Sequence, residues 1–125
     1  MAVALYDKYP VNRGHVLVVP KRHVETYFEA TLEEMDAITR LIIEVKGKLD
    51  QQFYPDGYNI GVNVGAAAGQ TIFHLHVHVI PRYSGDVPDP RGGIMRIKKS
   101  LVPYPEEGEE CTASSLHECD TMLSH

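Results

Sequence analysis

Three histidines occupy alternate positions of one short segment, as His74, His76 and His78. The residues that separate and follow them are aliphatic, and successive side chains of a β-strand point to opposite faces. A strand here therefore places all three imidazoles on one face and the aliphatic side chains on the other. Imidazole serves as a metal ligand, a nucleophile or a proton carrier near neutral pH. We expect this polar face to perform the chemistry of the protein.

A zinc site is one interpretation of this face. Residues i and i+2 of a strand have Cα atoms roughly 7 Å apart and can share one ion, whereas residues i and i+4 are roughly 13 Å apart. One zinc ion then binds two of the three histidines and needs a further ligand, which His15 supplies if it lies on a neighbouring strand. The residues alone leave a zinc-dependent hydrolase open as an alternative.

A phosphate site is the interpretation that the flanking residues favour. No aspartate or glutamate lies between Asp56 and Asp86, so this stretch does not repel an anion. It also lacks the carboxylates that hold Mg²⁺. The small residues of 65–70 bring backbone N–H groups close to the histidines. No candidate serine or cysteine nucleophile is nearby, so a histidine is the natural attacking group in a covalent, metal-free reaction.

The composition predicts one globular domain, because the chain has 125 residues, of which 43% are hydrophobic and 23% are charged. No apolar run approaches the roughly 20 residues of a membrane span, so no membrane association is expected. Cys111 and Cys119 lie near the C-terminus and provide no disulfide for the core, which suggests a reducing, cytoplasmic compartment. A net charge of −5 argues against a nucleic-acid partner.

The spacing of apolar and turn-forming residues predicts the elements that position the histidines. Thr31 and Glu34 form a capping box, and apolar residues at steps of three and four predict one helix over 32–51. Alternating and β-branched segments predict four strands, over 2–6, 14–19, 57–64 and 71–80. We expect an α+β domain with a mostly antiparallel sheet of four or five strands and one long helix packed on a face. The domain covers 1–94, and 95–125 is an acidic, partly flexible tail.

The run from His74 to Ile80 resembles the His-φ-His-φ-His-φ-φ signature of the histidine triad (HIT) family of nucleotide hydrolases and transferases, where φ is an apolar residue. The upstream segment 7–20, Asp-Lys-Tyr-Pro-Val-Asn-Arg-Gly-His-Val-Leu-Val-Val-Pro, resembles the first hairpin of the same family. The resemblance extends from about residue 2 to residue 94. Segment 86–93, Asp-Val-Pro-Asp-Pro-Arg-Gly-Gly, is more similar to the Fhit-like bacterial branch than to the Hint branch.

The resemblance implies separate roles for the histidines. His76 is expected to attack the α-phosphate and form a nucleotidyl-histidine intermediate that water hydrolyses. His78 is expected to contact the phosphate or the bridging oxygen and to aid departure of the leaving group. His74 and His15 are expected to hold the other imidazoles in the right tautomer.

The resemblance also implies the substrate contacts. Four residues match positions that hold phosphate in the family, namely Asn63, Gly69, Gln70 and Thr71. Asp7 matches a position that hydrogen-bonds the ribose hydroxyls. The expected substrate is a dinucleoside polyphosphate such as a diadenosine polyphosphate, or an adenosine phosphoramidate. No cofactor is expected, and the expected assembly is a symmetric homodimer.

The start of the chain departs from the family pattern. Family members begin earlier, with a segment that often contains a Cys-x-x-Cys pair and helps wall the nucleobase pocket. In relatives with that pair, zinc is completed by histidines that match His23 and His74. The pair is absent here, so we expect no structural zinc. Since the N-terminal segment is also missing, a non-catalytic nucleotide-binding or scaffolding module is an alternative function.

Overall fold

The computed structural model describes residues 1–97, and most of the expected tail 95–125, including Cys111 and Cys119, lies outside the described residues. Met1–Pro88 form one compact unit, which contains the predicted helix and all four predicted strands. The described residues from Asp89 onward belong to a separate unit and contain one short 3₁₀ helix, η3 (Gly93–Arg96). The sections below concern the unit Met1–Pro88.

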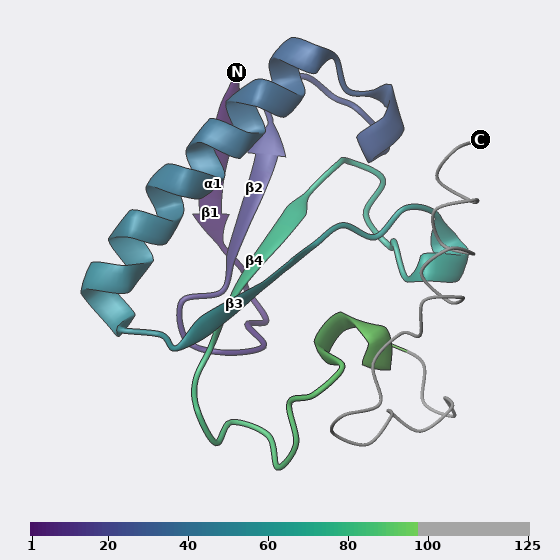
Figure 1. Cartoon of the computed structure of the whole chain (residues 1–125). Coiled ribbons are helices and arrows are strands. Elements are labelled where there is room, and N and C mark those ends of the chain that lie inside the picture. The colour runs from purple at the N-terminus through teal and green to yellow at the C-terminus, as the bar shows by residue number, and fades with distance from the viewer. Residues whose placement is uncertain (98–125) are drawn as a thin grey trace, which may run out of the picture. The chain divides into compact units, whose positions relative to one another are not determined.

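Four strands form one antiparallel sheet in the order β1-β2-β4-β3 (Figure 1). Their bounds are β1 (Ala2–Tyr6), β2 (Val16–Pro20), β3 (Gly57–Gly61) and β4 (Val77–Arg82). The predicted first strand has these bounds, whereas the second begins two residues later than predicted and the third is shorter. The α+β architecture predicted from the sequence is confirmed.

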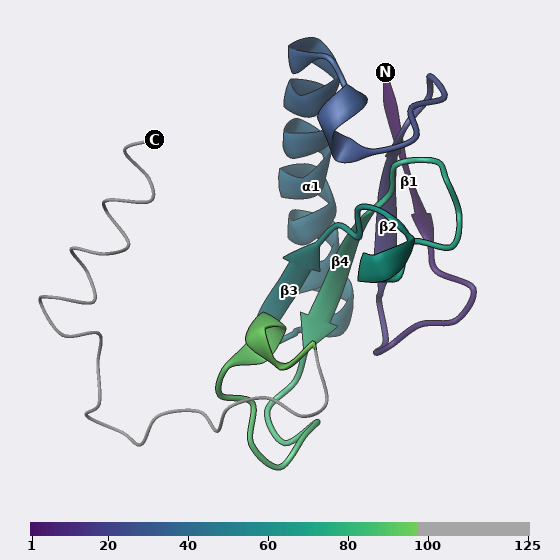
Figure 2. The same cartoon turned by 90° about the vertical axis from the view of Figure 1, so that its right-hand side faces the viewer.

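One long helix, α1 (Leu32–Phe53), covers one face of the sheet (Figure 2). Its predicted capping box is present, since Glu34 N–H donates to Thr31 Oγ1 at 3.1 Å and Thr31 N–H donates to the Glu34 carboxylate at 2.9 Å. The Glu34 carboxylate also binds the Arg22 guanidinium, which is the main cause that lowers the pKa of Glu34 to about 2. The start of α1 is therefore tied to the segment that follows β2.

The hydrophobic core lies between α1 and the sheet. Val16 and Val18 of β2 are buried, as are Val77 and Val79 of β4, while the residues between them are half-buried. Because side chains alternate along a strand, this burial directs the valines toward α1. The intervening residues occupy the opposite face, where His78 pairs with Leu17 across the β2–β4 ladder.

The predicted strand over 71–80 needs a correction, because β4 begins only at Val77 and the segment that holds His74 and His76 precedes it. The β3 ladder ends at Gly61 opposite His78, and the β2 ladder ends at Val18 opposite Val77. Residues before Val77 therefore have no neighbouring strand for regular pairing. The alternation of burial nevertheless continues, since Leu75 is buried between two half-buried histidines.

Among the described residues, no helix combines the length and the apolar character needed to cross a membrane.

Substitution of Thr31 by alanine is expected to lower the free energy of unfolding by about 1 kcal/mol, because it removes the side-chain acceptor of the capping box. Urea denaturation followed by circular dichroism measures this change. Thr26→Ala is the matched control, since Thr26 precedes the short helix η1 (Tyr27–Glu29) without a capping hydrogen bond from its side chain. Equal losses in the two variants would contradict the capping role.

Candidate active site

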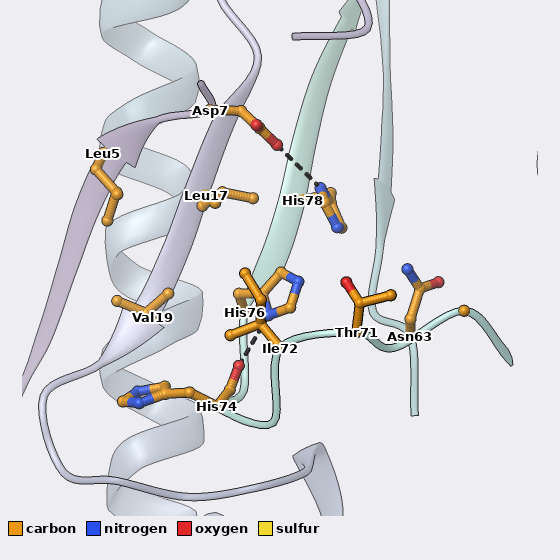
Figure 3. A pocket seen from close by; sticks show the side chains of 11 residues that line it. Leu5, Asp7, Leu17, Val19, Asn63, Thr71, Ile72, His74, His76 and His78 are labelled. Atoms are coloured by element: carbon orange, nitrogen blue, oxygen red, sulfur yellow. Dashed lines mark hydrogen bonds and ion pairs between the residues drawn. The ribbon is translucent and has the colours of Figure 1, made fainter. Parts of the chain in front are cut away.

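A pocket of about 480 Å³ opens on the face of the sheet turned away from α1 (Figure 3). Its volume lies in the range of small-molecule binding sites. Side chains and backbone from both halves of the chain line it, namely Leu5, Asp7, Leu17, Val19, Asn63, Gly69, Thr71, Ile72, His74, His76 and His78. The fold thus brings together seven of the nine candidate site residues at the surface of one cavity.

His76 lies between His78 and His74 in the pocket (Figure 3). Its Nδ1 is 2.8 Å from the backbone carbonyl oxygen of His74, which can only accept a hydrogen bond. Nδ1 of neutral His76 therefore carries the proton and donates it to this oxygen. Its Nε2 therefore holds the lone pair, which is the form of imidazole that acts as a nucleophile.

His78 has the opposite arrangement of protons, and His15 sets it. The Val11 N–H donates to His15 Nδ1 at 3.0 Å, so the proton of neutral His15 resides on Nε2. His15 Nε2 is 2.9 Å from His78 Nδ1 and donates to it. The proton of neutral His78 is then on Nε2, and His78 presents an N–H donor where His76 presents a lone pair.

Burial keeps His15 and His78, which we call the relay histidines, in the neutral form that this arrangement of protons requires. The pKa of His15 is lowered, mainly because the ring is buried, although the Asp7 carboxylate acts in the opposite direction. The pKa of His78 is also lowered, first by burial and then by the neighbouring His76 and His15, again against the effect of Asp7. At neutral pH both rings are uncharged.

Asp7 lines the pocket beside His78, and the buried His15 lies next to both without lining the cavity. One carboxylate oxygen accepts the N–H of Tyr9 at 2.8 Å. The other is 3.5 Å from His15 Nε2 and 3.9 Å from His78 Nδ1. The carboxylate thus lies beside the relay and lines the cavity, and both oxygens have acceptor capacity left for a hydroxyl group of a ligand.

The imidazole of His74 is held away from the other two. Its Nε2 donates to the backbone carbonyl of Pro20 at 3.0 Å, and its Nδ1 faces His23 Nδ1 at 3.3 Å. The His74 side chain thus anchors the segment before β4 to the end of β2. Its backbone carbonyl orients His76, so the main chain of His74 is closer to the chemistry than its imidazole.

The residues expected to hold phosphate separate into two groups. Asn63, Gly69 and Thr71 line the pocket. Gly69 has φ of +96°, a left-handed conformation that favours glycine, and an added Cβ would lie 4.0 Å from the Asn63 amide nitrogen. A glycine here allows the loop to turn beside the cavity without covering it.

Gln70 does not reach the pocket, contrary to its expected role. Its side chain is buried, with Oε1 accepting the Gly65 N–H at 2.8 Å and Nε2 donating to the carbonyls of Glu25 and Ile72. The side-chain oxygen and both N–H groups of the amide are therefore bound to the backbone. Gln70 thus holds the loop 65–72 in place.

Among the described residues, one group of three potential metal ligands lies together, comprising Asp7, His15 and His78, with ligand atoms within 4.8 Å of one another. A histidine that binds zinc through Nε2 carries its proton on Nδ1 and donates it to an acceptor. His15 Nδ1 instead accepts the N–H of Val11. The group does not fit a zinc ion in this arrangement, which argues against the zinc-dependent hydrolase.

The model of the HIT domain family matches residues 1–85. The chain belongs to the HIT family. An uncharacterized HIT-like protein of Mycoplasma pneumoniae is 45% identical over 82 residues, which cover 66% of this chain and 57% of that protein. AP-4-A phosphorylase of Mycobacterium tuberculosis is 41% identical over 90 residues, covering 69% of this chain and 45% of the relative.

A solved structure of a hypothetical histidine triad nucleotide-binding protein from Sulfolobus tokodaii has a TM-score of 0.65 and 35% sequence identity, and covers 98% of this chain and 74% of that chain. Proteins named after the Hint branch and after the Fhit branch both match. The matched part of this chain covers between 44% and 72% of the length of these curated relatives, and 57% and 58% of two Mycoplasma proteins.

The sequence analysis of this HIT domain did not identify the apolar wall of the pocket, which is formed by Leu5, Leu17, Val19 and Ile72. A signal was present for two of these residues. Leu17 and Val19 alternate with the buried Val16 and Val18, so period-two alternation already places them on the face that bears His78 once β2 is paired with β4. The partner strand, however, is not evident from the residues of β2.

The HIT domain is expected to lose stability as the pH falls through the range below about 6.5, the ordinary histidine pKa. His15 and His78 have lowered pKa values in the folded state, so between those values and 6.5 the unfolded chain binds more protons than the folded protein. The free energy of unfolding therefore increases with pH across this window.

Urea denaturation at pH values from 5 to 8 measures this slope, and His15→Asn should make it shallower by up to about 1.4 kcal/mol per pH unit, the limit for one proton. Asp36→Asn, which changes an exposed ion pair on α1, is the control. An unchanged slope in His15→Asn would show that burial of His15 does not resist protonation.

Proposed function

We propose that this HIT domain cleaves a nucleoside phosphoanhydride or phosphoramidate at the α-phosphate through a nucleotidyl-histidine intermediate on His76. The observation that supports this most directly is the hydrogen bond of 2.8 Å between His76 Nδ1 and the His74 carbonyl. It leaves the Nε2 lone pair directed to a pocket that His78 lines with an N–H donor. A nucleophile and a donor for the leaving group thus share one cavity.

In the first step, Nε2 of His76 attacks the α-phosphorus and a P–N bond forms. The bond from phosphorus to the leaving oxygen or nitrogen breaks, and its electron pair moves to the leaving group. The Nε2–H of His78 donates a hydrogen bond to that atom and stabilises the developing negative charge. A leaving phosphate departs as an anion, whereas a leaving amine takes the Nε2 proton of His78 while solvent returns a proton to that imidazole.

In the second step, water attacks the same phosphorus and the P–N bond to His76 breaks. The proton of the water passes to solvent, and His76 regains its Nε2 lone pair. Throughout both steps Nδ1 of His76 keeps its proton and donates a hydrogen bond to the carbonyl oxygen of His74. The ring is positively charged while it is phosphorylated, so the imidazole is a good leaving group and the intermediate hydrolyses readily.

The lining of the pocket supports a nucleotide as the substrate. Leu5, Leu17, Val19 and Ile72 provide an apolar wall that suits the flat face of a nucleobase. Asn63 and Thr71 provide polar groups on the side of His76, where we place the phosphates. Asp7 provides a carboxylate acceptor for ribose hydroxyls, and its negative charge favours neutral hydroxyls over phosphate at that end.

The name of the AP-4-A phosphorylase relative supports a dinucleoside polyphosphate such as a diadenosine polyphosphate as one substrate. We assign the chain to the Fhit-like bacterial branch, on the segment 86–93. No cofactor enters the proposed reaction. The symmetric homodimer and the cytoplasmic location stay predictions.

His76→Ala is expected to lower kcat for hydrolysis of diadenosine tetraphosphate and adenosine 5′-phosphoramidate by roughly 10³-fold or more, because the nucleophile is lost. Nucleotide affinity should change little, since the rest of the lining remains. Chromatographic assay of the released mononucleotide measures turnover, and calorimetry measures binding. Thr31→Ala serves as the control for a loss of stability that does not affect the pocket.

Acid quench of the wild-type protein with radiolabelled substrate should trap a nucleotidyl adduct, and His76→Ala should form none. A wild-type protein that binds nucleotide without adduct or turnover would identify the non-catalytic module instead. Activity that is lost with stoichiometric zinc upon chelation, in protein purified without an affinity tag, would identify the zinc-dependent hydrolase. Near-normal hydrolysis by His76→Ala would refute the proposed mechanism.

A further inference from the structure

The turn between β1 and β2 is held by the segment that follows β4. Asp86 is the centre of this contact, because its carboxylate accepts hydrogen bonds from Arg82 Nε and Nη2 at 2.8 and 2.7 Å and from the Tyr83 N–H at 3.0 Å. The same carboxylate accepts from Asn12 Nδ2 at 2.8 Å. These donors, first of all Arg82, hold the pKa of Asp86 well below its usual range, so the carboxylate is ionised whenever the protein is folded at neutral pH.

Asn12 transmits this contact to the turn. Its Nδ2 group donates to the Pro81 carbonyl at 3.0 Å as well as to Asp86, so both amide protons of the side chain are bound. Its own backbone carbonyl accepts the N–H of His15 at 3.2 Å. The Asn12 side chain is therefore bound to the end of β4, while its main chain closes the turn in which His15 lies.

The residue directly before Asn12 is Val11, whose N–H determines the tautomer of His15. The side chain of Val11 is 66% exposed, so packing holds it only in part. The direction of its N–H therefore depends on the residues on either side of it. Because Asn12 is fixed at three points, it can hold the Val11 N–H on His15 Nδ1.

A second contact from the same segment supports this arrangement. The Tyr83 hydroxyl donates to the backbone carbonyl of Arg13 at 2.8 Å, and the Arg13 guanidinium lies 5.0 Å from the centre of the Tyr83 ring. Consecutive residues of the turn, Asn12 and Arg13, are thus each bound by a residue from 81–86. The contacts fix the turn more firmly than either would alone.

We propose that Asn12 and Asp86 are positioning residues for the reaction proposed above, because they hold the Val11 N–H on His15 and thereby keep the His78 proton on the nitrogen that faces the pocket. Without this contact His15 can place its proton on Nδ1, and His15 Nε2 then becomes an acceptor. His78 Nδ1 would carry the proton toward it, and His78 Nε2 would present a lone pair to the leaving group instead of a donor.

This inference rests on the proposed function and is tested with two substrates that share adenosine 5′-phosphate but differ in the leaving group. The amine of adenosine 5′-phosphoramidate is a poor leaving group and needs a donor, whereas the 4-nitrophenolate of adenosine 5′-(4-nitrophenyl) phosphate leaves as a stable anion. Asn12→Ala removes the bridge but keeps the ion pair between Asp86 and Arg82, and Asp86→Asn weakens the bridge from the other side.

Both variants are expected to lower kcat on the phosphoramidate by roughly 10- to 100-fold, as loss of an orienting contact commonly does, and to lower kcat on the nitrophenyl ester by less than about 3-fold, because no strong donor is needed there. Asp50→Asn is the matched control, since it removes a carboxylate that binds Lys46 and Tyr58 on α1 and β3 without contacting the turn. It should change neither rate. Equal losses on both substrates would show a structural role only and would overturn the proposal.

Nitrogen-15 NMR of the imidazoles provides a readout that does not require turnover. Wild-type His78 is expected to have its proton on Nε2, and Asn12→Ala and Asp86→Asn are expected to show a mixture of tautomers. The wild-type tautomer retained in both variants would overturn the positioning role even if the protein hydrolyses neither substrate. A shifted tautomer in a protein without hydrolysis would support the positioning role and refute the proposed function alone.

Discussion

The antiparallel pairing of β2 with β4 is the interaction on which the whole site depends. Its ladder joins Val16 to Val79 and Leu17 to His78, so His15, one residue before β2, lies beside His78. The same register sends the valines of both strands to the core under α1. A shift by one residue would turn His78 toward the core and the valines toward the pocket, which makes the register energetically unambiguous. Core packing and the position of the relay are therefore consequences of one pairing.

Backbone groups determine what each histidine can do. The carbonyl oxygen of His74 accepts a hydrogen bond from His76 Nδ1–H, and the N–H of Val11 donates a hydrogen bond to His15 Nδ1. Through His15 the second contact directs the proton of His78 to the pocket. Although both side chains are imidazoles, His76 thus presents a lone pair on Nε2 and His78 presents an N–H donor on Nε2. Burial supports this division, because it lowers the pKa of His15 and His78 and keeps them neutral.

Local patterns predicted much of the fold. The capping box at Thr31 and the apolar spacing after it predicted α1, since both depend on residues within a few turns of one another. Alternation predicted the faces of the strands, and resemblance to the HIT family indicated most of the residues that line the pocket. The start of β4 was not predictable from the residues around His74, because a strand begins only where pairing with its neighbours begins. Gln70 was misassigned for a similar reason, since the carbonyl of Glu25 that engages its amide is distant in the sequence.

The sequence by itself determined that three imidazoles share one face, that no carboxylate from 57 to 85 accompanies them, and that a helix is available to cover the other face. These properties follow from residue type and from the period of a strand, both of which are local. Only the tertiary structure decided which nitrogen of each imidazole holds the proton, and that Asn12 and Asp86 meet beside the turn before His15. A tautomer depends on the single hydrogen-bond partner within about 3 Å, and these partners come from separate segments that only folding brings together.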